Sequence, residues 1–143
     1  MLDGLESILT SPWTPYAYYA SSIVTDLVFT YLHVRKDGPA AERNLIIRKE
    51  IEANGEESLL TRILPLQILG SGVIIGGAYG IDYTLGIHDA PLNISKGACY
   101  FFGTVKHLLA VRHLARLFNN KYANLIAEAI EKATHNRLGV SME

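Results

Sequence analysis

This sequence has a single cysteine, no excess of either charge and no recognisable catalytic motif. Cys99 is the only cysteine among the 143 residues, which excludes an internal disulfide and any metal or redox site of the CxxC type. The 13 basic and 14 acidic residues give a net charge of -1, so no charge excess indicates a nucleic-acid partner. No nucleophile elbow, HExxH sequence, P-loop or dinucleotide fingerprint occurs. The sequence therefore indicates no catalytic residue, no metal site and no cofactor.

Charge is also missing locally, and its absence marks out apolar blocks. No acidic or basic residue occurs from Ile63 to Ile81. This stretch belongs to a predicted span over residues 61–81. Two further, mainly apolar blocks cover residues 13–33 and 97–117, and the last of these contains Lys106, Arg112 and Arg116. Each of the three blocks has about the 20 residues that cross a bilayer. The first block does not resemble a cleaved signal peptide, because no Lys or Arg precedes it and Asp26 interrupts it. The sequence therefore predicts an all-α bundle of three transmembrane helices, forming one membrane domain over residues 1–143.

The basic residues predict how this bundle is oriented. They are absent before the first block, and only Lys96 lies between the second and third blocks. Under the positive-inside rule the N-terminus and the loop 82–96 lie outside, whereas the loop 34–60 and the tail 118–143 lie in the cytoplasm. We therefore expect a multi-pass protein of the cytoplasmic membrane. The alternative is a soluble helical bundle, which the mean hydropathy of only +0.16 favours but which has no reason to segregate its basic residues.

Three glycines recur one helical turn apart in "GVIIGGAYG", at Gly72, Gly76 and Gly80. In a soluble helix each would cost roughly 1 kcal/mol relative to alanine. Between membrane helices, small residues allow the backbones to approach closely. We predict that these glycines form a packing face. Packing against the first or third span is favoured over self-association or contact with another membrane subunit.

Polar side chains inside the blocks predict a second feature. Asp26 lies near the middle of the first block, where a carboxyl costs roughly 2.5–3.5 kcal/mol on insertion scales, so it should face the bundle interior. Counting residues along each span brings polar groups of the other two blocks to a similar depth. The predicted intramembrane cluster is Asp26, Thr30, Gln67, Lys106 and His107. It is either a structural ion pair or a proton, ion or metal site.

The remaining predictions concern the cytoplasmic side. Pro39 and Gly55 suit the beginning and the stop of an amphipathic surface helix in the first loop. A second such helix is predicted from Lys121 to Lys132. The basic end of the third block can reach the headgroups, and lipid phosphate is its expected ligand. The residues concerned are Arg112, His113 and Arg116.

One stretch, "TDLVFTYLHVRKDGPAAERN", resembles a pattern in an uncharacterised family of small polytopic membrane proteins, found mainly in archaea and also in bacteria. There an intramembrane Asp and Thr precede a G-x-x-x-E-x-N-P turn. The matching residues are Asp26, Thr30, Gly38, Glu42 and Asn44. Leu45 stands where the family usually has proline. The resemblance implies a membrane protein and no particular activity.

Two classes of function are compatible with these features. The first is a non-catalytic accessory or structural subunit of a larger membrane protein complex, whose partners are the lipid bilayer and other membrane subunits. The second is a small proton-, ion- or metal-handling transporter or an intramembrane enzyme, which would use Asp26 with Lys106 or His107.

Overall fold

The computed structural model describes residues 11–138, and every regular element in this range is helical. Predictions about residues 1–10 and 139–143 lie outside the described residues. The all-α class is therefore confirmed. In chain order the elements are α2 (Thr14–Asp37), a 3-10 turn η1 (Pro39–Ala41), α3 (Leu45–Asn54), a π-helical turn η2 (Leu59–Ile63), α4 (Leu64–Thr84), α5 (Ile94–Phe118) and α6 (Lys121–Leu138).

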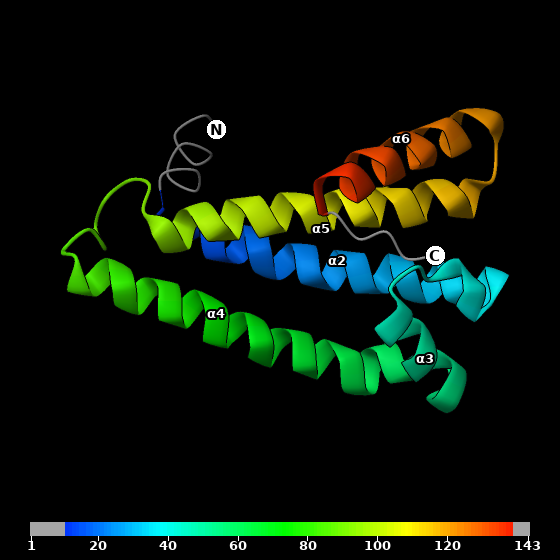
Figure 1. The fold of residues 1–143 in the computed structure, drawn as a ribbon, viewed down its shortest axis with the longest axis horizontal. Coiled ribbons are helices and arrows are strands. Elements are labelled where there is room, and N and C mark those ends of the chain that lie inside the picture. Colours follow the sequence, from blue (N-terminus) through cyan, green and yellow to red (C-terminus); the bar gives the residue numbers. More distant parts are fainter. Residues whose placement is uncertain (1–10, 139–143) are drawn as a thin grey trace, which may run out of the picture.

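The three long helices α2, α4 and α5 match the three apolar blocks and lie side by side, while α4 leans away from the other two toward the end that carries α3 (Figure 1). α2 and α5 approach each other closely at Gly103. A Cβ atom at this position would lie 2.7 Å from the Tyr18 ring and 3.4 Å from the Cα atom of Tyr19. Gly103 is therefore the glycine that this helix pair requires.

The apolar core lies where α2 meets α3 and the beginning of the α4 segment. Ile23, Leu27 and Val34 of α2 pack there with Ile51 of α3 and Leu59 of η2. Since α3 contributes a buried side chain, its apolar side docks under the bundle. Its stop at Gly55 is confirmed, because this residue caps α3 with a positive φ of 78°, which glycine adopts without strain.

The predicted beginning of this loop helix at Pro39 is wrong. Only one 3-10 turn forms at Pro39–Ala41, and the backbone is extended at Glu42 and Asn44 before α3 begins at Leu45. The Asn44 side chain accepts hydrogen bonds from the backbone N–H groups of Ile46 and Ile47, which is the role of an N-cap residue. This cap sets the beginning of the helix later than proline alone suggested.

The segment Leu59–Thr84 is the only helix in the described range that is long and apolar enough to cross a membrane, by length and composition alone. A core helix of a soluble protein also passes this test, but such a helix is mostly buried. Here only 11 % of the most apolar 18-residue stretch of the helix is buried, and Leu66, Leu69 and Val73 are largely exposed. The helix therefore gives weak support for a membrane location, and it does not establish three spans.

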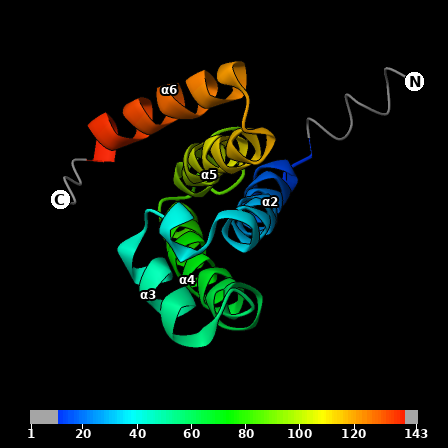
Figure 2. The same ribbon diagram turned by 90° about the vertical axis from the view of Figure 1, so that its right-hand side faces the viewer.

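The predicted tail helix forms as α6, which folds back along α5 rather than pointing away from it (Figures 1 and 2). It covers the side of α5 away from α3 and α4 (Figure 2). Ala127 in its middle is fully buried, and Arg116 of α5 lies 3.4 Å from Glu131 of α6. The C-terminal half of α5 therefore packs against both α2 and α6.

Candidate functional site

Asp26, Gln67 and Lys106 meet in the interior, one from each long helix. The Lys106 Nζ atom lies 3.3 Å from the Asp26 carboxylate and donates to the Gln67 side-chain oxygen over 3.0 Å. Asp26 is only 8 % exposed. The expected contact between Asp26 and Lys106 is confirmed. Lys106 bridges all three helices at one level, since α4 reaches the pair through Gln67.

The other two members of the predicted cluster do not take part in this bridge. Thr30 is buried one turn further along the same face of α2. His107 instead packs against the ring of Tyr18, with the ring centroids 4.9 Å apart. The reason is the 100° step between neighbouring helical positions, which directs Lys106 and His107 to different neighbours.

A second buried polar cluster lies toward the end of the bundle that carries α3. The Nδ1 atoms of His33 and His113 are 2.9 Å apart, and both residues are buried. The second nitrogen of His33 lies 3.2 Å from Asp37, whereas that of His113 lies 3.1 Å from Arg112 and 3.9 Å from Glu42. Only the His33–Asp37 pair has a signal in the sequence, through its spacing of four. The two histidines are 80 residues apart and no local pattern connects them.

Arg112, His113 and Arg116 do not form the exposed headgroup site that the sequence predicted. Arg112 is 6 % and His113 is 3 % exposed, so neither side chain reaches the surface. The fold-back of α6 places Glu131 among basic side chains, with a shortest distance of 3.0 Å to Arg43 and 3.4 Å to Arg116. Arg112 is 4.0 Å from the same carboxylate. A carboxylate of the chain itself therefore occupies the place expected for lipid phosphate.

The residues of the family pattern build the turn that leads from α2 into α3. Gly38 has a φ of 83° and ends α2. Glu42 accepts a 2.6 Å hydrogen bond from the Asn44 backbone N–H, and Asn44 caps α3. Leu45 is the first helical residue, a position that favours proline because its N–H has no helical partner. Leucine at this position therefore begins α3 without proline.

The Glu42 carboxyl is 5 % exposed. Burial raises its pKa above the usual 4.5, although the hydrogen bond from Asn44 and the charge of Arg112 act in the opposite direction. A proton is therefore held more easily on Glu42 than on a carboxyl in water.

Sequence reasoning missed Asp82, which is fully buried at the end of α4. Its carboxylate accepts the backbone N–H groups of Ile94 and Ser95 over 3.0 and 2.9 Å. Asp82 thus fixes the beginning of α5 to the end of α4, which is a structural role. An acidic residue at the end of the most apolar segment was the available signal.

The predicted intramolecular packing of the α4 glycines is wrong. A Cβ atom at Gly72, Gly76 or Gly80 would have no neighbouring atom from another part of the described chain within 4 Å. The side of α4 that faces the bundle carries larger residues at helical spacing. They are Gln67, Ser71, Ile75, Ala78 and Asp82.

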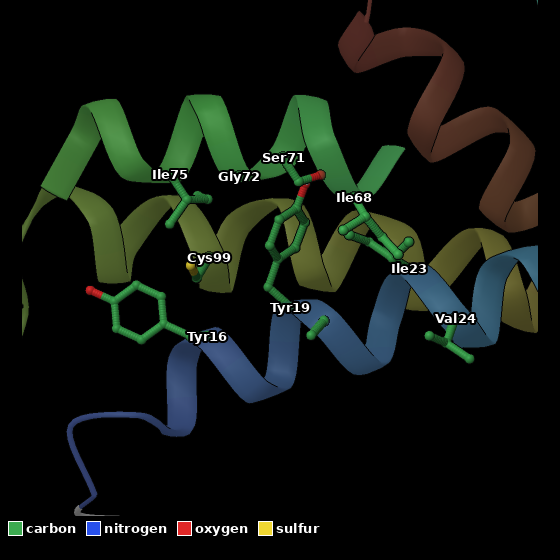
Figure 3. A pocket seen from close by; sticks show the side chains of 10 residues that line it. Tyr16, Tyr19, Ile23, Val24, Ile68, Ser71, Gly72, Ile75 and Cys99 are labelled. Carbon is green, nitrogen blue, oxygen red and sulfur yellow. The ribbon is translucent and has the colours of Figure 1, made fainter. Parts of the chain in front are cut away.

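A mostly apolar groove of about 320 Å³ lies beside this row, between α2 and α4, with Cys99 of α5 at its floor (Figure 3). The Tyr19 hydroxyl crosses from α2 to the Ser71 hydroxyl of α4, 2.8 Å away. Gly72 belongs to the groove lining, so one residue of the glycine face borders the groove.

Among the side chains that the structure describes, residues 11–134, no three His, Cys, Asp or Glu are grouped so that they could hold a metal ion. The interior of the bundle instead contains charged side chains that are paired across helices. It also contains two imidazoles that are hydrogen-bonded to each other. The resemblance to a small polytopic family stays a prediction. Comparison with known protein families, with curated proteins and with solved structures finds no match.

Proposed function

We propose that this chain is a non-catalytic accessory subunit of a larger membrane protein complex, and that it binds its partner through α4. The observation that carries the proposal is the contrast within α4. It is the most apolar helix, yet its glycine-bearing side touches no other part of the described chain. A helix in lipid gains little from hydrophobic burial, so close backbone contact is what small residues contribute. The glycines are therefore free for a helix of another subunit or of a second copy.

The proposal includes three spans, α2, α4 and α5, which cross the cytoplasmic membrane with the N-terminus outside. The charged side chains within the third block, Lys106, Arg112 and Arg116, are costly in lipid unless they are paired. Lys106 is paired with Asp26, and Arg116 with Glu131. The exposed side of α5 is apolar, with Phe101, Phe102, Leu108 and Val111. Pairing inside and apolar side chains outside are what a membrane requires of a helix that carries charges.

The two remaining helices suit the cytoplasmic side of this arrangement. α3 docks under the bundle through Ile51 and exposes Ile46. α6 exposes Tyr122, Leu125 and Ile126 on the side opposite its contact with α5. Such amphipathic helices bind the boundary between headgroups and acyl chains. They also offer contact surface to a partner.

Purification from native membranes tests the proposal. A tagged wild-type chain should isolate with a partner in fixed stoichiometry. Gly76→Leu should lose this partner, because the larger side chain blocks close approach. It should not change the thermal unfolding of the isolated chain, since position 76 has free space around it. Leu69→Ile, a matched change on exposed α4 surface, should keep the partner. Equal retention by both variants would contradict the proposal.

The Asp26–Lys106–Gln67 bridge favours a second candidate, a small transporter or intramembrane enzyme that handles protons, ions or metal. Buried ionisable residues within membrane helices commonly mark such pathways. If the bridge is functional, Asp26→Asn should leave assembly intact and abolish proton-coupled flux in liposomes. If the bridge is structural, the same variant should weaken assembly. The two readouts therefore separate the candidates.

A further inference from the structure

The hydrogen bonds of His33 and His113 determine which nitrogen of each ring carries a proton. The Arg112 guanidinium only donates, so the His113 Nε2 atom, 3.1 Å away, accepts. A neutral His113 then carries its proton on Nδ1 and donates it to the Nδ1 atom of His33. His33 in turn carries its proton on Nε2 and faces the Asp37 carboxylate at 3.2 Å. Every donor in this chain points from Arg112 toward Asp37.

The two ends of the chain differ in their access to water. The Asp37 side chain is 45 % exposed, whereas those of His33 and His113 are 7 % and 3 % exposed. The Glu42 side chain, 7 % exposed, faces the inner end. Its Oε1 atom accepts a hydrogen bond from the Asn44 backbone N–H. Its Oε2 atom is left to face the Nε2 atom of His113 at 3.9 Å.

We propose that Glu42, His113, His33 and Asp37 form a proton-transfer path, which connects a buried carboxyl to water at the end of α2 while the bundle stays closed. The path goes beyond a role in assembly. It supplies a further activity, which is rapid proton exchange at Glu42. Its ligand is the proton alone.

The transfer balances at each bond. Protonated Glu42 gives the proton on Oε2 to the Nε2 atom of His113, as the Nδ1 proton of His113 passes to the Nδ1 atom of His33. The Nε2 proton of His33 passes to Asp37, which releases it to water. Glu42 is left ionised, and both rings are neutral with their protons on the opposite nitrogens. Rotation of the rings, or transfer in the opposite direction, restores the first arrangement.

Arg112 controls the inner step. His113 Nε2 lies 0.8 Å closer to Arg112 than to Glu42, as 3.9 minus 3.1 shows. The His113 ring must therefore give up its hydrogen bond with the Arg112 guanidinium and form one with the Glu42 carboxyl before a proton can pass. Further charges around the path are Glu131 of α6 beside Arg112, and Lys36 of α2, which donates to the backbone oxygen of Leu117. Asp26 shares the buried interior and opposes ionisation of Glu42. The surroundings of the path therefore contain both acidic and basic side chains.

Time-resolved infrared spectroscopy of the full chain in nanodiscs tests the path. At a pH at which Glu42 is protonated, the chain should show a carboxylic C=O band that is missing in Glu42→Gln, and a light-induced pH rise should remove this band. Since a positioned acid–base group speeds proton transfer by about 10²–10⁴-fold, Asp37→Asn and His33→Gln should slow the loss of this band by on the order of 100-fold. The final amplitude should not change. Glu52→Gln, at an exposed site on α3, should keep the wild-type rate.

Nitrogen-15 spectra of the histidines provide the second readout. At a pH at which Glu42 is protonated, His113 should show a protonated Nδ1 and His33 a protonated Nε2. Because the Asp37 side chain is 45 % exposed, we expect Asp37→Asn to keep the fold. This variant therefore tests the path even where His33→Gln does not fold. An unchanged rate in Asp37→Asn would overturn the proposal. So would a His113 that carries its proton on Nε2 while Glu42 is protonated, or a Glu42 that never gains a proton while the chain is folded.

Discussion

Neutralising Lys106 tests whether the interhelical bridge holds the three long helices in register. Lys106→Gln leaves the Asp26 carboxylate, 8 % exposed, without a cation. Breaking a buried ion pair in this way costs about 3–5 kcal/mol, and we expect the lower end because glutamine can still donate one hydrogen bond. Asp26→Asn should cost less, about 1–3 kcal/mol, because Lys106 keeps its 3.0 Å bond to Gln67.

The double variant Asp26→Asn/Lys106→Gln distinguishes a coupled pair from two independent losses. It contains no buried charge at this level, and its three amide groups can hydrogen-bond to one another. We therefore expect it to be more stable than the sum of the two single effects predicts, by about 1–3 kcal/mol.

Reversible unfolding of the reconstituted protein measures all four members of this cycle. Lys49→Gln, on the exposed side of α3, serves as the control and should stay within about 0.5 kcal/mol of wild type. A coupling energy below about 0.5 kcal/mol would refute the reasoning, because distant and independent sites add within that margin.

Further predictions concern other parts of the fold. Asp82→Ala should destabilise the chain by about 1–3 kcal/mol, because it leaves the N–H groups of Ile94 and Ser95 without their acceptor; Asp89→Ala, at a side chain 96 % exposed, is the control in the same thermal unfolding assay. Because the folded state binds the Glu42 proton more tightly than the unfolded chain does, its contribution to stability is fully present below pH 4.5 and is lost as the pH rises through the raised pKa. Glu42→Gln should therefore remove this part of the pH dependence, and an unchanged profile would speak against the burial argument. Glu131→Gln should loosen α6 and speed hydrogen exchange over residues 121–134, whereas the exposed Glu128→Gln should not; similar exchange in both would show that the arginine contacts do not hold α6.

The helices and one interhelical contact could be predicted because their signals are local. Apolar blocks set the approximate bounds of α2, α4 and α5, and Gly55 marked the end of α3. Asp26 and Lys106 were found by counting depth along each span. That count works because the long helices are roughly parallel, so residues at the same depth become neighbours.

The errors arise where a long-range contact overrides a local pattern. Small residues indicate close packing but not which backbone they meet, and here Gly103 meets α2 whereas Gly76 meets nothing within the described chain. The basic end of α5 suggested exposed headgroup contacts, because nothing local shows that α6 returns with Glu131. The His33–His113 pair depends on the packing of α2 against α5, which is known only once the two helices are placed.

Labelling of single cysteines from each side of the membrane tests the central claim, that α2, α4 and α5 all cross the bilayer. In a Cys99→Ala background, a cysteine at Leu85 should react only from outside. Cysteines at Leu45 and Lys121, at the beginnings of α3 and α6, should react only from the cytoplasm. Labelling at position 45 from the outside, or at all three positions from one side, would contradict the three-span arrangement.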